Sequence, residues 1–171
     1  MKEVVLTQGK IAIVDDWAYS DVALFKWYAS MVPGGAFYAM CHVTFSRGRQ
    51  GHIAMHRLLA MLHGQDIGVV VDHRNRNTLD NRIENLRAAT KSQNQYNRLS
   101  QPRARSGYKG VSYHKGTGRW VARISADRIA RHLGYFDSPE AAGKAYDVAA
   151  IELHGEFARL NFSPENHAVL A

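Results

Sequence analysis

Four polar side chains between residues 69 and 98 have the types and spacing needed for chemistry on a phosphodiester. Asp72 supplies a hard carboxylate oxygen, and His73 supplies a base whose unperturbed pKa lies near neutrality. Asn85 and Asn94 carry neutral amides, which can ligate or orient without adding charge. Together these groups suit a one-metal site that supports attack on a phosphodiester.

A strand, a loop, a second strand and a helix are expected to position these four side chains. The β-branched run at residues 69–71 predicts a short strand that ends at Asp72 and His73, and an Asn-rich turn follows it. A second strand is expected over residues 83–87, and a polar helix over residues 90–99. Adjacent strand residues point to opposite faces, so Asp72 and His73 can serve one site only if the strand ends or bends there.

This segment resembles the HNH endonucleases with the ββα-metal fold, in particular the homing endonucleases of the H-N-N type. The resemblance rests on the pattern DH…DNRIENLR…SQN, which is far more specific than an isolated Asp-His pair. It implies that His73 is the general base for the attacking water and that Asn85 orients the hairpin that positions it. It also implies that Asp72 and Asn94 hold a divalent cation, with Mg²⁺ the natural choice and Mn²⁺ the alternative. The competing interpretation is a polar hairpin without catalytic function.

Positive charge is concentrated in the middle of the chain. Of the net charge of +7, residues 1–90 contribute +2, with ten Lys and Arg against eight Asp and Glu. Residues 91–135 contribute +9, with ten against one, and residues 136–171 contribute −4, with two against six. A basic block interleaved with Tyr and Trp is typical of a protein that binds a polyanion, although a solvated basic face is the simpler alternative.

Cysteine usage and hydropathy set further limits. Cys41 is the only cysteine, which excludes a disulfide framework and a four-Cys structural zinc site within one chain. His52 and His56 are four residues apart, but no third ligand follows at a usual spacing, so we expect scaffold histidines there. The start MKEVVLTQGK lacks a long apolar run, and no segment approaches the length of a membrane span. We therefore expect a cytoplasmic protein that does not contact membranes.

Mixed secondary structure is expected before the Asp-His pair. Residues 4–16 predict a hairpin that turns at Gln8-Gly9. The run DVALFKWY, residues 21–28, predicts a short helix, and residues 37–43 predict a strand. Residues 54–63 predict a helix that Gly64 ends.

A second unit is expected after a basic linker at residues 100–106, whose Pro, Ser and Arg are typical of linkers. Residues 108–113, 119–125 and 129–136 predict three strands. In the second of these, Trp120, Ala122 and Ile124 alternate with Arg119, Val121, Arg123 and Ser125, which gives one packed and one free face. Ser138 as N-cap, Pro139 at the first helical position and Gly155 at the end predict a helix that covers the Trp120 face.

The second unit is similar to the APETALA-type, or ethylene-response-factor, DNA-binding domain over residues 107–162. The similarity rests on GYKGV, GRWVARI, HLGYFDSPEAAGKAYDVAA and the closing LNF. It implies that the free face of the sheet contacts DNA through Lys109, Ser112, His114, Arg119, Arg123, Ser125 and His132. Several of these positions are commonly Arg or Trp in the plant family, so we expect a different and more tolerant recognition sequence.

The sequence therefore predicts an α+β chain. A mixed N-terminal region with a ββα-metal motif fills residues 1–99, and a three-stranded antiparallel sheet packed on one C-terminal helix fills residues 107–171. The predicted function is site-specific, homing-type endonuclease action on double-stranded DNA. The protein would come from a phage or bacterial mobile element. With one Asp-His-Asn-Asn set per chain, a monomer would nick one strand. Further phosphate contacts are expected from Arg74, Arg76, Arg87, Lys91, Arg98, Arg103 and Arg105. A DNA-binding regulator with a relic nuclease core and a structural RNA- or nucleoid-binding protein are the alternatives.

Overall fold

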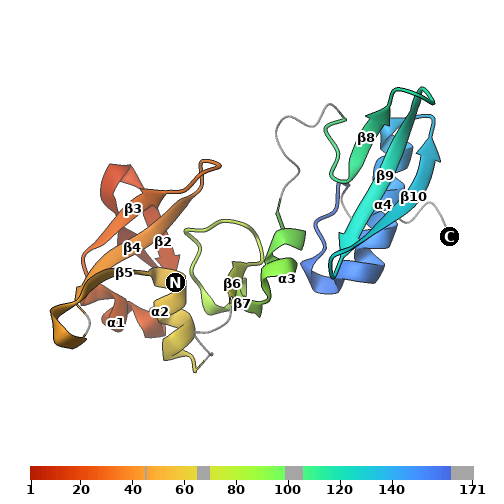
Figure 1. Cartoon of the computed structure of the whole chain (residues 1–171). Helices are drawn as coiled ribbons and strands as arrows, with labels where there is room; N and C mark the ends of the chain where they lie inside the picture. Colours follow the sequence, from red (N-terminus) through yellow and green to blue (C-terminus); the bar gives the residue numbers. More distant parts are fainter. Residues whose placement is uncertain (45, 65–69, 99–105, 163–171) are drawn as a thin grey trace. The chain divides into compact units, whose positions relative to one another are not determined.

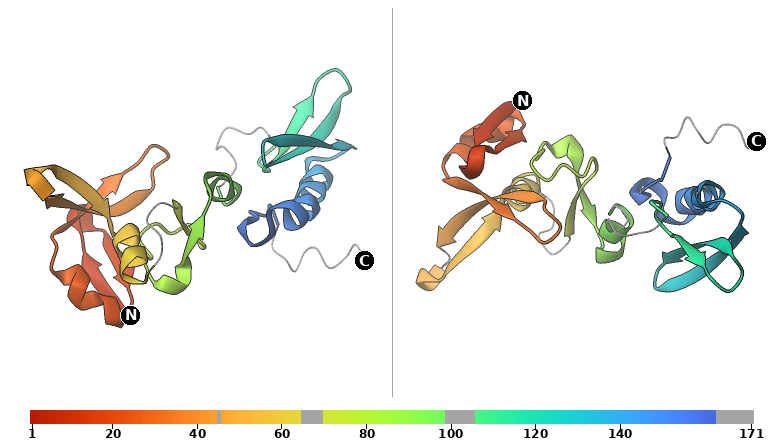
Figure 2. Two further views of the ribbon diagram at one scale, coloured as in Figure 1. Left: turned by 60° about the horizontal axis from the view of Figure 1, so that its bottom comes forward. Right: turned by 90° about the horizontal axis from the view of Figure 1, so that it is seen from above.

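The computed structural model describes residues 1–44, 46–64, 70–98 and 106–162. Figure 2 shows it in two further orientations. The chain forms two compact units, Met1–Thr90 and Lys91–Ala171. Both units contain strands and helices, with small antiparallel sheets, which confirms the α+β prediction (Figure 1). None of the helices in the described ranges is long and apolar enough to cross a membrane.

The first unit begins with the predicted hairpin. Strands β1 (Lys2–Val5) and β2 (Ile11–Val14) pair antiparallel, joined by the 3-10 turn η1 (Thr7–Gly9). Gln8 adopts φ 60° inside this turn and Gly9 adopts φ 63°, so two successive residues are left-handed. A second 3-10 turn, η2 (Asp16–Ala18), leads into the short helix α1 (Tyr19–Ala23).

The helix expected at residues 21–28 is wrong in its second half. Strand β3 (Trp27–Met31) begins there, and it pairs antiparallel with β4 (Phe37–Thr44). Trp27 lies opposite Cys41 and its indole Nε1 donates to the carbonyl of Val22 at 2.8 Å. The pairing of β3 with β4 joins Trp27 to a residue far along the chain, and it outweighs the local helical pattern.

A three-stranded sheet and one helix supply the core of the first unit. The 3-10 turn η3 (Ser46–Gly48) joins β4 to β5 (Gln50–Ala54), which completes the order β3-β4-β5. Helix α2 (Met55–Leu62) follows at the predicted place, and Gly64 beyond it has φ 76°. Its buried Met55 and Leu59 join Val14, Val22 and Cys41 in the core.

The segment that carries the Asp-His pair is a short two-stranded ladder. Strands β6 (Val70–His73) and β7 (Leu86–Ala89) pair antiparallel, with Asp72 opposite Arg87. Residue 69 of the predicted first strand lies outside the described residues. The second strand begins at Leu86 rather than at residue 83, because Ile83–Asn85 form the 3-10 turn η4, in which the Asn85 amide donates to the Arg82 carbonyl.

The second unit contains the predicted sheet and helix. Strands β8 (Val111–His114), β9 (Arg119–Ala126) and β10 (Ile129–Phe136) form an antiparallel sheet with β9 central. Helix α4 (Pro139–His154) packs on this sheet and leads into η5 (Gly155–Phe157). The Ser138 hydroxyl accepts a hydrogen bond from the Ala141 amide at 3.1 Å, as the N-cap prediction requires.

Helix α3 (Lys91–Tyr96) clusters with the second unit. The ring of Tyr96 stacks on His154, with centroids 3.8 Å apart. The ammonium group of Lys109 donates to the carbonyl oxygens of Tyr96 and Arg98. The predicted linker lies almost wholly outside the described residues, so a domain boundary at residues 100–106 stays a prediction.

Candidate active site and nucleic-acid face

Asp72 and His73 are buried side chains at the end of β6, with 5 % and 4 % of their surface exposed. The chain turns at once after them. The Arg74 amide donates to the Asn85 carbonyl at 2.8 Å, and the Arg76 amide donates to the His73 carbonyl at 2.9 Å. Arg76 itself has φ 65°. The strand therefore ends where the chemistry needs both side chains to serve one site.

Arg87 forms a buried ion pair with Asp72. Its Nε and Nη2 both lie within hydrogen-bonding distance of Asp72 Oδ2, at 2.9 and 2.8 Å. Both side chains are 6 % exposed. This differs from the expectation that Arg87 contacts a DNA phosphate, because cross-strand pairing turns its guanidinium inward to neutralise the carboxylate.

His73 sits in a cage of aromatic and polar groups. Its Nε2 lies 3.4 Å from Oδ1 of Asn81, and its ring centroid lies 5.1 Å from that of His56 and 6.0 Å from that of Tyr38. Burial lowers the pKa of His73, while the hydrogen bond to Asn81 and the negative charge of Asp72 act in the opposite direction. A lowered pKa keeps the imidazole neutral at neutral pH, the form that can accept a proton.

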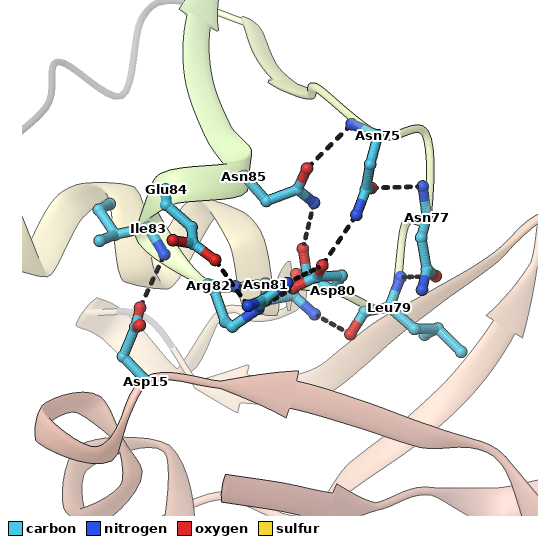
Figure 3. A network of polar contacts seen from close by, with 10 residues as sticks. All are labelled: Asp15, Asn75, Asn77, Leu79, Asp80, Asn81, Arg82, Ile83, Glu84 and Asn85. Carbon is cyan, nitrogen blue, oxygen red and sulfur yellow. Dashed lines mark hydrogen bonds and ion pairs between the residues drawn. The ribbon is translucent and has the colours of Figure 1, made fainter. Parts of the chain in front are cut away.

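The Asn-rich loop between the two strands is closed by Asn85 (Figure 3). Its Oδ1 accepts from the Asn75 amide at 2.9 Å, and its Nδ2 donates to the Asp80 carbonyl at 2.7 Å. Asn75 Nδ2 in turn donates to the Asp80 carboxylate at 2.8 Å. Arg82 also binds that carboxylate through Nε and Nη2, and these bonds hold the pKa of Asp80 below its usual range. The loop is therefore held from within by side-chain bonds.

Asp72 and Asn94 are the predicted ligands of a metal, and each would bind it through oxygen. Asp72 carries a carboxylate at the end of β6, and Asn94 carries a side-chain amide on α3. Hard oxygen donors of this kind suit Mg²⁺ or Mn²⁺. Among the residues that the structure describes, no group of three or more His, Cys, Asp or Glu side chains gathers as a metal site. A role for Asn94 as the second ligand stays a prediction.

The other cations expected to contact phosphates differ in exposure. Arg74 and Arg76 are exposed on the loop that follows β6, and Lys91 and Arg98 are exposed at the two ends of the α3 segment. Arg103 and Arg105 lie outside the described residues.

The free face of the second sheet gathers most of the residues expected to contact DNA. The strand register places Ser112 beside Val121, His114 beside Arg119, and Arg123 beside His132. Ser112, Arg119, Arg123, Ser125 and His132 are exposed, and His114 is half-buried. Val121 was expected to be free but is only 1 % exposed, because it lies on the central strand between two neighbours.

Tyr135 is a further residue of this face that alternation along β10 does not predict. The pairing of β10 with β9 shifts register between His132 and Gly134. Leu133 packs in the core beneath the sheet, and the shift places Tyr135 opposite Val121, on the same face as His132. Its ring centroid lies 5.0 Å from His132 and 5.6 Å from His114, and 41 % of the residue is exposed.

Lys109 belongs to a different set of contacts. It is half-buried and its ammonium group binds two carbonyls of the α3 segment. Its backbone amide donates to Oδ1 of Asn161 at 2.6 Å. These bonds give Lys109 a structural partner set that the prediction of a DNA contact did not include.

Comparison with known proteins assigns the two parts of the chain separately. The family model for an HNH endonuclease matches residues 54–96, and the model for the AP2 domain matches residues 106–156. APETALA2-like protein 2 of Oryza sativa is 44 % identical over 63 residues, which cover 36 % of this chain and 14 % of the rice protein.

Two proteins of Arabidopsis thaliana give similar matches. The AP2-like ethylene-responsive transcription factor ANT is 47 % identical over 62 residues, covering 35 % of this chain and 11 % of that protein. The ethylene-responsive transcription factor ERF024 is 46 % identical over 57 residues, covering 32 % of this chain and 31 % of that protein. The chain thus spans less than a third of the length of these relatives. It joins an HNH endonuclease domain at residues 54–96 to an AP2 DNA-binding domain at residues 106–156.

Proposed function

We propose that this chain is a metal-dependent DNA endonuclease whose HNH segment cuts and whose AP2 domain directs it to DNA. One observation carries the proposal. At the end of β6, inside the segment that matches the HNH endonuclease model, a buried carboxylate and a buried imidazole stand on adjacent residues, and Asn85 closes the loop behind them. These are the group types that hydrolysis of a phosphodiester needs.

In the proposed mechanism His73 accepts a proton from a water molecule. The water oxygen forms a bond to phosphorus, and one P–O bond of the DNA backbone breaks. Asp72 and Asn94 would hold a divalent cation, which would stabilise the negative charge on the scissile phosphate. Asn85 keeps the loop closed and so fixes the direction of His73.

The AP2 domain would direct the nuclease to its DNA target. A DNA-binding module attached to the catalyst raises the local concentration of the active site near its target. Its free face carries arginines, histidines and a tyrosine, which can contact phosphates and base edges of double-stranded DNA. The expected product of one chain is a nick, and the expected class is the homing type carried by mobile elements.

A pair of arginine variants tests the DNA-binding face. Arg123→Ala removes a cation from this face. Arg131→Ala is the control, because Arg131 pairs with Ile124, whose side chain lies in the core on the other side of the sheet. If Arg123 contacts a base, its removal should weaken DNA binding by about 1–3 kcal/mol. If it contacts a phosphate, the slope of the logarithm of the binding constant against the logarithm of the salt concentration should fall by about 1. Equal effects of both variants in a fluorescence-anisotropy titration would contradict the assignment.

Cleavage itself is tested on supercoiled plasmids that carry a library of genomic fragments. The expected result is conversion to open circles with Mg²⁺ or Mn²⁺ and none with EDTA. Linear product would indicate paired active sites instead of a single nicking chain. If the protein binds DNA but cleaves it neither with Mg²⁺ nor with Mn²⁺, the proposed nuclease activity is refuted.

The second candidate function is that of a DNA-binding regulator with an inactive HNH segment. It is favoured by the similarity of residues in the second unit to plant transcription factors. The retained Asp72, His73 and Asn85 in their buried arrangement favour the enzyme. The plasmid assay separates the two, because a regulator binds DNA without changing its topology.

A further inference from the structure

Asn81 is the most completely buried polar residue of the Asn-rich loop. Only 1 % of its surface is exposed, and it ranks among the largest fully buried side chains of the chain. A buried amide stabilises a fold only when its polar atoms find partners. One of the partners of Asn81 is the ring of His73.

The orientation of the Asn81 amide is fixed by its other hydrogen bond. Its Nδ2 donates to the Leu79 carbonyl at 3.1 Å, so its Oδ1 is the atom that faces His73 Nε2 at 3.4 Å. An amide oxygen can only accept, and Nε2 must therefore carry the hydrogen. A neutral imidazole with its hydrogen on Nε2 has its lone pair on Nδ1, so the contact with Asn81 selects one tautomer of His73.

The backbone on either side of Asn81 is anchored on the N-terminal hairpin. The backbone N–H of Asn81 donates to the Ile13 carbonyl at 2.8 Å, and the backbone N–H of Ile13 donates to the Leu79 carbonyl at 2.8 Å. Next to this bridge the Ile83 amide donates to the Asp15 carboxylate at 2.7 Å, as Figure 3 shows. Strand β2 is itself held in the core through Val14, which is 0 % exposed.

We propose that Asn81 is the positioning residue of His73, and that strand β2 is the platform on which it is mounted. The proposal rests on the proposed role of His73 as the base. Asn81 sets which ring nitrogen carries the hydrogen and restricts rotation of the ring. Strand β2 lies outside residues 54–96, so the nuclease segment depends on a part of the chain that the HNH family model does not cover.

Two substitutions at Asn81 separate positioning from simple support of the fold. Asn81→Leu and Asn81→Asp both remove the donor to the Leu79 carbonyl, but only aspartate keeps an acceptor oxygen toward His73. We expect Asn81→Leu to lower kcat for plasmid nicking by roughly 10–100-fold with unchanged KM, as losses of orienting groups do. Asn81→Asp is expected to stay within a few fold of the wild type.

The matched control is Asn77→Leu. Asn77 is an exposed asparagine of the same loop whose side chain accepts from the Leu79 amide. Its replacement is expected to leave kcat unchanged. Thermal melts of all three variants establish that the first unit is folded.

An NMR measurement on the full chain gives a readout that does not need cleavage. With ¹⁵N-labelled histidine, the wild type and Asn81→Asp are expected to show a slowly exchanging Nε2–H resonance for His73, which Asn81→Leu loses. Equal losses of kcat in the Leu and Asp variants would mean structural support only and would overturn the proposal. Absence of the resonance from the wild type would overturn it as well. A wild type without nuclease activity would refute the proposed function, while the resonance would still decide whether Asn81 holds the ring.

Discussion

Replacing Arg87 by leucine would leave the Asp72 carboxylate buried without its main cation. Both side chains of this pair are 6 % exposed, and two guanidinium nitrogens contact one carboxylate oxygen at 2.9 and 2.8 Å. Solvent therefore screens the pair little. Breaking a buried ion pair from one side costs about 3–5 kcal/mol, because the remaining charge loses its partner in a medium of low polarity.

The double variant distinguishes this electrostatic cost from poorer packing. In Asp72→Asn with Arg87→Leu no charge is left uncompensated, so most of the stability should return. We expect a coupling energy of at least about 1.5 kcal/mol, in the upper part of the range for residues in direct contact.

The assay is urea unfolding followed by tryptophan fluorescence. The chain has three tryptophans, Trp17, Trp27 and Trp120. In a Trp120→Phe background the remaining two belong to the first unit, and Trp27 is buried in its core. The signal then reports the unit that holds the ion pair.

Additive single effects below about 1 kcal/mol each would refute this reasoning. That result is typical of an exposed ion pair. It would mean that water reaches Asp72 and that the fold does not select for positive charge at this position.

Two further predictions concern single residues of each unit. Gly110→Ala should destabilise the second unit by about 2–5 kcal/mol, because φ is 77° and a Cβ would lie 2.0 Å from the Tyr146 ring; an unchanged Trp120 unfolding transition would contradict this. Burial, with the nearby charges of His73 and Arg57, lowers the pKa of His56 to about 3. Because this pKa lies below the unfolded value, stability is full above pH 6.5 and falls as the pH drops toward 3, by roughly 2–3 kcal/mol at pH 4.5. His56→Phe should remove that part of the slope, and identical slopes in urea titrations of both proteins would disprove the assignment.

Elements with strong local signals were predictable from the sequence. Helix α4 begins and ends where Ser138, Pro139 and Gly155 indicate, because capping acts within one turn of the chain. The turn of the first hairpin at Gln8 also follows from local residues. In these elements local preference and tertiary packing agree.

Elements that depend on distant partners were not predictable in the same way. Trp27 continues a helical pattern in the sequence, but its pairing with Cys41 makes it the start of a strand. Leu24, an apolar residue of the run predicted to be a helix, is 79 % exposed. In β10 the register shift before Gly134 reverses the alternation, and sequence spacing gives no signal for it.

The candidate site divides along the same line. The motif identifies Asp72, His73 and Asn85, because all three lie in one short segment and their residue types and spacing can be seen in the sequence. Arg87 and Asn81 reach the site through cross-strand register and through the pairing of the loop with Ile13. Such pairings join residues far apart in the sequence, so their part in the site emerged only from the fold.

The most direct test of the account compares two histidine variants on one DNA substrate. His73→Ala removes the proposed base, whereas His42→Ala removes an exposed histidine of the same unit, on strand β4. Single-turnover nicking with Mg²⁺ and DNA affinity are measured for both variants and the wild type. We predict that His73→Ala loses at least about 100-fold in the nicking rate, as expected for the loss of a general base, and keeps its affinity for DNA. His42→Ala is expected to keep both the rate and the affinity. Equal nicking rates for His73→Ala and the wild type would contradict the role of His73 as the general base.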